Sequence, residues 1–323
     1  MTHRGAIRAI VLATLTMAPL AAPAAADERT TEKVTIRVET IADGLSHPWG
    51  IDFLPDGRMI VTERPGRLRI VGKDGTLSEP LSGVPEVDAR GQGGLLDVTL
   101  HPDFDRNRLV YLSFAEPGPD RTNSTAVARG KLAADGTALE NVEVVFSQNP
   151  KVASIRHYGS RVVFAPDGTM FITTGERSNR EFRDQAQDLK SGLGKVIRLN
   201  PDGTLPQDNP FVGRDDALPG IWSYGHRNIQ GAAIHPQTGN LWTIEHGPLG
   251  GDEINIPEPG ANYGWPVVSH GREYSGAPVN DGRKDAPGMG DPIVTWTPVI
   301  APGGMTFYTA DAFPAWKGNL LIA

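Results

Sequence analysis

The stretch Gly50-Ile51-Asp52-Phe53-Leu54-Pro55-Asp56-Gly57-Arg58-Met59-Ile60-Val61-Thr62-Glu63 decides the fold. Two short runs of strand-forming residues flank a Pro-Asp-Gly turn, which is typical of a β-hairpin. Variants of this unit recur at residues 96–114, 162–174, 232–245 and 304–322. The turns are spaced by about 47 to 75 residues, as expected of four-stranded blades joined by loops of different length.

The composition agrees with a fold made almost entirely of strands. The chain of 323 residues contains 38 glycines and 27 prolines, and its apolar runs are short and bounded by turns. A β-sandwich also uses such turns, but repetition of one hairpin unit favours a radial array. We predict an all-β, six-bladed β-propeller of which five inner hairpins are visible. The last strand-like run stops at Ala323, so we expect the final blade to be incomplete in this chain.

The N-terminal segment is typical of a secretory signal peptide. Arg4 and Arg8 precede an apolar run from Ala9 to Ala22, and small residues follow at 24–26. The run is too short, and too interrupted by proline, to span a bilayer. We therefore predict a signal peptide at residues 1–26, a propeller domain at residues 27–323, no membrane span and a periplasmic or secreted location.

Composition also excludes several kinds of chemistry. The chain has no cysteine, which rules out thiolate zinc sites, iron-sulfur clusters and cysteine nucleophiles. Its net charge is −7 with few clusters of Lys or Arg, which argues against nucleic acid as a partner. Histidine, carboxylates, arginine and a bound cofactor remain as candidates for the functional groups.

The first candidate cluster is residues 156–161, just before the third predicted inner strand. His157 lies there, and an imidazole can act as a general base near neutral pH when a carboxylate holds its other nitrogen. Glu176, at the far end of the same hairpin, is the candidate carboxylate. Alternatively, His157 caps a turn and Glu176 pairs with Arg177 or Arg180 at the surface.

The second candidate cluster, residues 222–231, contains Arg227 and Asn228 immediately before another inner strand. A guanidinium suits bidentate recognition of a carboxylate or a quinone oxygen, and Asn adds a neutral donor and acceptor. The alternative is an arginine that braces loops.

The third candidate cluster begins at Glu245-His246-Gly247-Pro248 and includes Asp252, Glu253 and the segment 262–266. A Gly-Pro turn followed by carboxylates offers the oxygen ligands that a hard cation prefers. The alternative is an ordinary turn with a solvated Asp-Glu pair. A zinc site is less favoured, since the spacing of His226, His235 and His246 matches no usual set of zinc ligands.

These three clusters, in this order on inner strands, resemble the soluble quinoprotein glucose/sorbosone dehydrogenases and their aldose sugar dehydrogenase relatives. The resemblance extends from about residue 35 to the end and includes Gly44-Leu45-Ser46-His47-Pro48-Trp49-Gly50 and Gly91-Gln92-Gly93-Gly94-Leu95-Leu96-Asp97.

The resemblance implies an enzyme that uses pyrroloquinoline quinone (PQQ) and calcium to oxidise aldose sugars at C1 to lactones. It implies His157 as the general base, with hydride transfer to the quinone, and Glu176 stands where the family usually has a shorter Asp. The implied cofactor or substrate contacts are Gln92, Arg227, Asn228 and Tyr274. The implied calcium ligands are Gly247 and Pro248 for the cofactor's ion, and Glu253 and Tyr263 for a further one.

The same resemblance places a Lys and Arg residues of the family beyond the point where this sequence stops. It also implies an electron acceptor, which the sequence does not identify. Two other functions remain open at this level: a calcium-dependent propeller lactonase or other hydrolase, and a propeller that binds a partner without catalysis.

Overall fold

The computed structural model describes residues 27–323, so the predicted signal peptide at residues 1–26 lies outside the described residues. The chain divides into a first unit that ends at Thr40 and a second unit, Ile41–Ala323. The described part of the first unit is an antiparallel hairpin of β1 (Asp27–Thr30) and β2 (Thr35–Val38). Within residues 27–323, no helix is long and apolar enough to cross a membrane.

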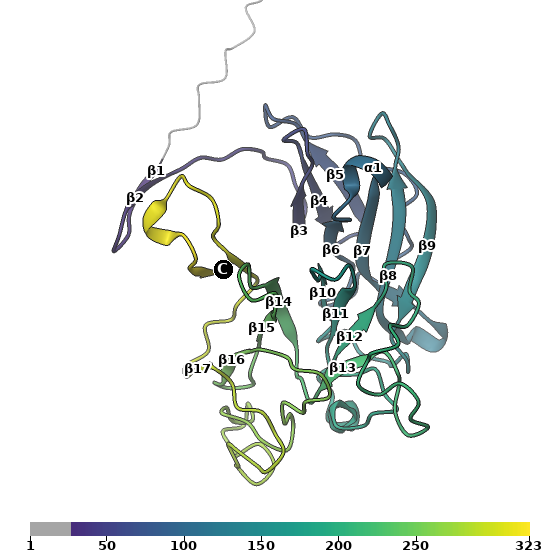
Figure 1. Cartoon of the computed structure of the whole chain (residues 1–323), viewed down its shortest axis with the longest axis vertical. Helices are drawn as coiled ribbons and strands as arrows, with labels where there is room; N and C mark the ends of the chain where they lie inside the picture. The colour runs from purple at the N-terminus through teal and green to yellow at the C-terminus, as the bar shows by residue number, and fades with distance from the viewer. Residues whose placement is uncertain (1–26) are drawn as a thin grey trace, which may run out of the picture. The chain divides into compact units, whose positions relative to one another are not determined.

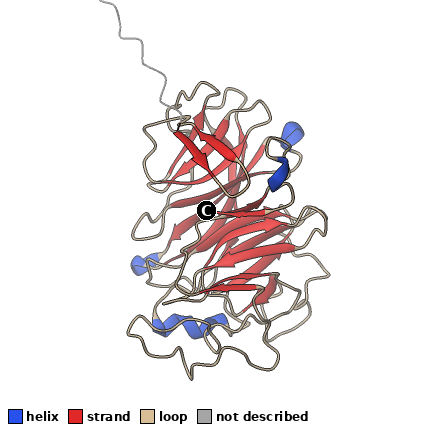
Figure 2. Cartoon of the chain, turned by 90° about the vertical axis from the view of Figure 1, so that its left-hand side faces the viewer, coloured by secondary structure: helices blue, strands red, loops and turns tan. Residues whose placement is uncertain are grey.

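The second unit is built from successive antiparallel sheets (Figures 1 and 2). The first sheet contains β3 (Pro48–Phe53), β4 (Met59–Glu63) and β5 (Arg67–Val71). The second contains β6 (Leu95–Leu100), β7 (Leu109–Pro117), β8 (Asn123–Leu132) and β9 (Leu139–Ser147). The third contains β10 (Gly159–Phe164), β11 (Met170–Thr174), β12 (Lys195–Leu199) and β13 (Ile221–Tyr224).

Two further sheets complete the described part of the second unit. One contains β14 (Ile229–Ile234), β15 (Leu241–Glu245), β16 (Asp252–Asn255) and β17 (Val294–Trp296). The other is a pair, β18 (Met305–Phe307) and β19 (Leu320–Ile322). Helices are short: α1 (Phe104–Asn107), α2 (Arg180–Arg183) and the 3₁₀ turns η1 (Pro119–Arg121), η2 (Asp184–Ala186) and η3 (Pro314–Trp316).

The first strand of each sheet lies beside the first strand of the next. Contacts join β3 to β6, β6 to β10, β10 to β14 and β14 to β18. Each of these inner strands pairs with the following strand as an antiparallel hairpin, which confirms the five predicted hairpins. A radial series of meander sheets around such inner strands is a β-propeller, as predicted from the repeat.

The turn chemistry of the sequence is realised in the hairpins that contain Pro-Asp-Gly. Gly57 adopts a left-handed backbone with φ of 86°, and its N–H donates to the carbonyl of Leu54 at 2.8 Å. The second hairpin differs, because His101-Pro102-Asp103 leads into the short helix α1 rather than directly into β7. The hairpin unit therefore predicts the strand pairing but not the insertion between the strands.

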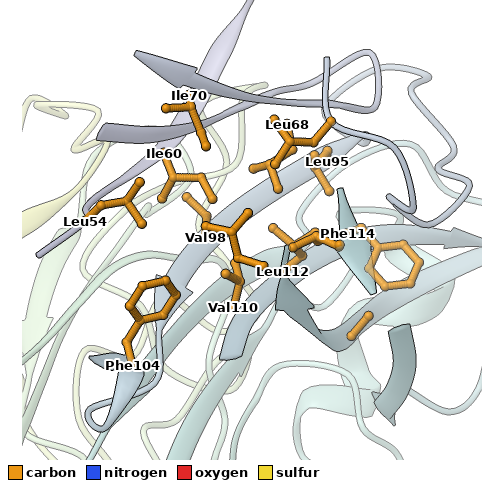
Figure 3. Packing of buried hydrophobic residues seen from close by; sticks show 14 of the residues in the cluster. Leu54, Ile60, Leu68, Ile70, Leu95, Val98, Phe104, Val110, Leu112 and Phe114 are labelled. Carbon is orange, nitrogen blue, oxygen red and sulfur yellow. The ribbon is translucent and has the colours of Figure 1, made fainter. Parts of the chain in front are cut away.

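The hydrophobic core of the first two sheets lies between them. Leu54, Ile60 and Leu68 of the first sheet region pack with Val98 and Leu112 of the second, and all five side chains are buried (Figure 3). Successive side chains of a strand point to opposite faces of its sheet. The apolar side chains on the facing sides of the two sheets supply this layer. Packing between neighbouring sheets fixes the angle between blades and so places the loops at their ends.

Candidate functional site

Four of the predicted site residues share one position in the fold: they lie just before an inner strand. Gln92 precedes β6, His157 precedes β10, and Arg227 and Asn228 precede β14. Because the inner strands lie side by side in the same direction, their starting ends converge. These four residues line one cleft of about 230 Å³ together with Tyr274. The structure thus brings together five residues that are up to 182 positions apart in the sequence (274 − 92).

His157 is buried and paired with a carboxylate. Its Nδ1 lies 3.1 Å from Oε1 and 3.1 Å from Oε2 of Glu176, and the two residues are 7% and 1% exposed. A neutral imidazole that donates Nδ1–H to this carboxylate keeps its lone pair on Nε2. Among the described residues, no hydrogen-bond partner is found for Nε2. The pair therefore has the arrangement of an oriented general base.

Electrostatics keep this imidazole neutral near physiological pH. Burial lowers the pKa of His157 from its ordinary value of 6.5, and the nearby charges of Arg227 and His246 act in the same direction. The hydrogen bond and negative charge of Glu176 raise the pKa but do not outweigh burial. A base that must be unprotonated is thus kept in its active form.

Gln92 supports the backbone of His157. Its Oε1 accepts the N–H of His157 at 2.8 Å, while its own N–H donates to the carbonyl of Ile155 at 2.8 Å. His157 has a left-handed backbone with φ of 50°, which a β-carbon disfavours. Gln92 therefore helps to hold the loop in this conformation, and only its amide nitrogen remains for a ligand.

Arg227 is a second group near the carboxylate of Glu176. Its Nε is 4.0 Å from Glu176 Oε1, and its Nη1 donates to the carbonyls of His246 at 2.9 Å and Gly247 at 2.8 Å. Nε is buried and has no hydrogen-bond partner among the described residues. A buried donor without a partner costs about 1 to 3 kcal/mol, so this atom is suited to an acceptor on a bound molecule.

A second buried histidine–glutamate pair supports the loop that carries Arg227. Nδ1 of His226 lies 2.9 Å from Oε1 of Glu245, and the imidazole stacks on Tyr263 with ring centroids 4.9 Å apart. Oε2 of Glu245 accepts the N–H groups of Arg227 at 2.6 Å and Asn228 at 3.3 Å. Burial favours the neutral carboxyl, but His226 and these N–H groups hold the pKa of Glu245 below its ordinary value.

Asn228 acts on the main chain of the first cluster. Its Oδ1 accepts the N–H of Gly159 at 3.1 Å and the amide of Gln230 at 3.2 Å. Since Gly159 begins β10, the amide ties the starting ends of β10 and β14 together. Tyr274 differs, because the residue is 73% exposed and its hydroxyl is 3.5 Å from Arg227 Nη2. Tyr274 therefore lies at the rim of the cleft.

The four predicted metal residues line a second cavity that Arg227 also borders. Gly247, Pro248, Glu253 and Tyr263 surround about 20 Å³, whereas a single water needs roughly 10 to 15 Å³. Burial and the negative charges of Glu245 and Asp252 raise the pKa of Glu253 to about 8. Glu253 forms no ion pair within residues 27–323, so a cation beside it would relieve this repulsion.

The other three predicted ligands are less simply arranged. The carbonyl of Gly247 already accepts from the guanidinium of Arg227, a positive group that a bound cation would have to share. The hydroxyl of Tyr263 donates to the carbonyl of Ile256 and accepts the N–H of Glu258 at 3.1 Å, which leaves its main-chain carbonyl as the available ligand atom. Pro248 can offer only its carbonyl. The donor set therefore fits a cation best at Glu253.

Three aromatic or imidazole side chains of the site were not assigned from the sequence. Trp265 lies under Arg227, with the guanidinium carbon 5.2 Å from the ring centroid. Trp49 and His246 line the cleft with His157. All three residues lie within sequence segments that suggested the site, so their position in those segments was the available signal. His246 had been considered only as a zinc ligand, and β15 and its following turn bring it to the cleft.

Comparison with known proteins agrees with this architecture. Residues 45–323 match the family described as Glucose / Sorbosone dehydrogenase. The chain is 44% identical over 322 residues to aldose sugar dehydrogenase YliI of Escherichia coli, covering 99% of this chain and 83% of that protein. It superimposes on the apo-form of the soluble aldose sugar dehydrogenase from Escherichia coli with a TM-score of 0.85 and 45% identity, covering 88% of this chain and 82% of that one.

A more distant structure was determined with the cofactor. The PQQ-bound aldose sugar dehydrogenase from Streptomyces coelicolor matches with a TM-score of 0.70 and 31% identity, covering 88% of this chain and 76% of that chain. These proteins are oxidoreductases by name, and the matches confirm the resemblance drawn from the sequence motifs. The chain belongs to the glucose/sorbosone dehydrogenase family.

Proposed function

We propose that this protein oxidises aldose sugars at C1 to lactones with PQQ as cofactor and calcium as a bound ion. The observation that carries the proposal is the shared cleft of His157 and Arg227, with Glu176 in contact with the first and 4.0 Å from the second. Kinship with aldose sugar dehydrogenases supports the same substrate class.

The residues present fit this cofactor. PQQ is planar and bears carboxylate and carbonyl oxygens, and the cleft offers the unpartnered Nε of Arg227 and the exposed ring of Tyr274. Glu253 is the residue best suited to calcium, with the carbonyls of Gly247, Pro248 and Tyr263 as further oxygen ligands. When bound, PQQ supplies an electrophilic carbon that accepts hydride.

His157 removes the proton in this mechanism. Its Nε2 accepts the proton of the C1 hydroxyl as the C1 hydrogen leaves as hydride, so the sugar loses two electrons and two hydrogens. Glu176 holds Nδ1–H and stabilises the imidazolium that forms. Arg227 directs positive charge to the oxygen at which negative charge develops, an effect that contributes a few kcal/mol in comparable sites. The aldose and an electron acceptor are the implied partners.

We also propose that the propeller has six blades and that the protein is exported to the periplasm or secreted. The exposure of Ile51 and Phe53 on β3, 53% and 64%, supports a further blade packed beside the first. The charged and apolar pattern of residues 1–26 supports export. Cell fractionation, followed by detection of the protein in the periplasmic, cytoplasmic and culture-medium fractions, tests the location.

The competing lactonase receives less support. Within residues 27–323, no group of three or more His, Asp or Glu side chains is placed to hold a metal. A propeller lactonase centres its ion on such side-chain carboxylates, whereas this site combines one Glu with main-chain carbonyls. The pairing of Glu176 with His157 likewise favours a base over a simple binding surface.

Reconstitution tests the proposed function directly. The protein is incubated with PQQ and calcium, and reduction of a dye is followed with a panel of aldoses. We expect sugar oxidation that requires PQQ and that falls by about 10²- to 10⁴-fold in His157→Ala. Lactone hydrolysis without PQQ would instead identify the hydrolase, and no reaction with unchanged ligand binding in His157→Ala would identify a binding propeller.

A further inference from the structure

Arg177 is a buried cation that the proposed mechanism does not use. It follows Glu176 after β11, and its side chain is among the largest that are fully buried, with 0% exposure. It forms no ion pair with any carboxylate in the part of the chain that the structure describes. A buried guanidinium is costly unless its donors are satisfied, so its hydrogen bonds indicate what it stabilises.

These hydrogen bonds are directed to the main chain around His157. Nε donates to the carbonyl of Arg156 at 2.9 Å, and Nη2 donates to the carbonyl of Ser154 at 2.8 Å. The guanidinium carbon lies 3.9 Å from the centroid of the Tyr158 ring. One planar group therefore contacts the residue before His157 and the residue after it.

Asn123 anchors the same guanidinium to the neighbouring sheet. Its carbonyl accepts Nη1 of Arg177 at 3.1 Å, and its Oδ1 accepts Nη2 at 2.6 Å. Its amide nitrogen donates to Asp88 at 2.8 Å. The side chain of Asn123 therefore links the negative carboxylate of Asp88 to the guanidinium of Arg177. Asn123 lies at the start of β8, so the loop of His157 is fixed relative to the second sheet.

The loops joined in this way have unfavourable backbone conformations. φ is 50° at His157, 74° at Arg177 and 69° at Ser178. Non-glycine residues in this region cost of order 1 to 3 kcal/mol each, and they persist only where surrounding contacts hold them. Ser154 Oγ also donates to the carbonyl of Arg177 at 2.5 Å, which joins the two loops in the opposite direction.

We propose that Arg177 is a positioning residue, whose guanidinium fixes the main chain on both sides of His157 so that Nδ1 meets Glu176 and Nε2 remains available to the cleft. Lysine cannot replace it, because an ammonium lacks the planar fork that reaches three main-chain carbonyls and one side-chain oxygen at once. The catalytic consequence rests on the proposed function, whereas the positioning itself is a property of the folded chain.

The test compares Arg177→Lys with a matched control, Arg198→Lys. Arg198 is also buried, at 5% exposure, donates to Asp167 and Asp208, and stacks on Trp222 at 5.1 Å. It lies on β12 and contacts no residue of the His157 cleft. Both substitutions remove the hydrogen bonds of a buried arginine, so loss of stability alone affects both variants.

The measurement is the titration of the His157 imidazole by NMR, without PQQ. The signal is assigned by its loss in His157→Gln, and the charged groups that face the imidazole are Glu176, Arg227 and His246. We expect the pKa of His157 to rise toward 6.5 in Arg177→Lys, because loosening of the loop admits water. In Arg198→Lys, we expect the wild-type titration.

Kinetics give the second measurement. In the reconstituted enzyme, Arg177→Lys is expected to lower kcat by about 100-fold with a displaced pH profile. Arg198→Lys should retain the wild-type kcat and profile. An identical His157 titration in wild type and Arg177→Lys would overturn the proposal. If wild type shows no PQQ-dependent oxidation but the titration shifts, the proposed function fails and the positioning role stands.

A milder variant covers the case in which Arg177→Lys does not fold. Ser154→Ala removes only the hydroxyl that donates to the carbonyl of Arg177. We expect a smaller shift of the His157 titration in the same direction. An unchanged titration in a folded Ser154→Ala protein would count against the proposal.

Discussion

Both carboxylate oxygens of Glu176 lie 3.1 Å from Nδ1 of His157. Glu176 thus reaches the imidazole while His157 still lines the cleft. Glu176 also accepts the N–H of Ser178, so its carboxylate is held from the main chain as well. The orientation of His157 is therefore fixed by a buried carboxylate and by the backbone contacts of Gln92 and Arg177.

Glu176→Gln should lower kcat/KM and move the pH profile. The carboxylate raises the pKa of His157, so its loss lets burial lower that pKa further. The base is active when neutral, so the acidic limb of the kcat/KM profile follows the pKa of His157. This limb already lies below pH 6.5 in wild type and should move to lower pH in the variant. We expect the plateau to fall by about 10²- to 10⁴-fold because the amide no longer fixes the tautomer. The pH dependence of kcat/KM provides the measurement, and a limb shifted to higher pH would contradict it.

Calcium should stabilise the wild-type protein through Glu253. A cation beside this carboxylate offsets the repulsion from Glu245 and Asp252, so added calcium should raise Tm and a chelator should reverse the rise. At a concentration about 100 times Kd, binding contributes about 2.7 kcal/mol. Glu253→Gln should lose this response, whereas Glu258→Gln, at an exposed position, should retain it. Equal calcium responses in both variants would exclude Glu253 as a ligand.

Gly175→Ala should displace the loop that carries His157. A β-carbon at Gly175 would lie 2.1 Å from the carbonyl oxygen of His157, and this contact involves main chain that cannot rotate away. We expect lower Tm and loss of most PQQ-dependent activity. Gly220→Ala is the control, since its β-carbon would meet neighbours at 3.5 Å or more. Thermal unfolding and activity assays on both variants decide whether the clash has this effect.

Lys195→Met should flatten the pH dependence of stability. The ammonium of Lys195 is buried and donates to the carbonyls of Gln185, Ala186 and Leu193, and burial lowers its pKa to about 7 from 10.5. The unfolded chain therefore binds more protons between these values, so the unfolding free energy rises with pH in this window. Denaturant titrations at about pH 7 and about pH 9 measure the slope. Lys190→Met, at an exposed position in the segment before β12, should keep the wild-type slope.

The sequence predicted the hairpins better than the connections between them. The strand pairs at 50–63 and 162–174 follow directly from apolar runs around Pro-Asp-Gly, because both the turn and the strands are local. The helix α1 after Pro102 was not predicted, whereas β18 and β19 form the hairpin predicted at residues 304–322. The repeated hairpin pattern contains no signal for an insertion between β6 and β7.

The site follows the same division. His157, Glu176 and Arg227 could be proposed from residue type and position before an inner strand, and the structure brings them together. The roles of Gln92 and Asn228 could not be proposed in this way. Their side-chain oxygens accept main-chain N–H groups, and these roles depend on which N–H groups lie opposite them in the fold. Arg177 was considered only as a surface partner of Glu176, and it is fully buried with its side chain on the loop of His157.

By itself, the sequence determined the repeated hairpin, the absence of thiol chemistry and the chemical types available at the strand ends, since these depend on composition and on neighbours along the chain. Only the tertiary structure decided which of those groups meet. His157 and Arg227 are separated by 70 positions (227 − 157), and they share a cleft because adjacent blades place the starts of β10 and β14 side by side. Burial, which sets the pKa of His157 and the cost of an unpartnered Arg227 Nε, likewise arises only when the sheets pack.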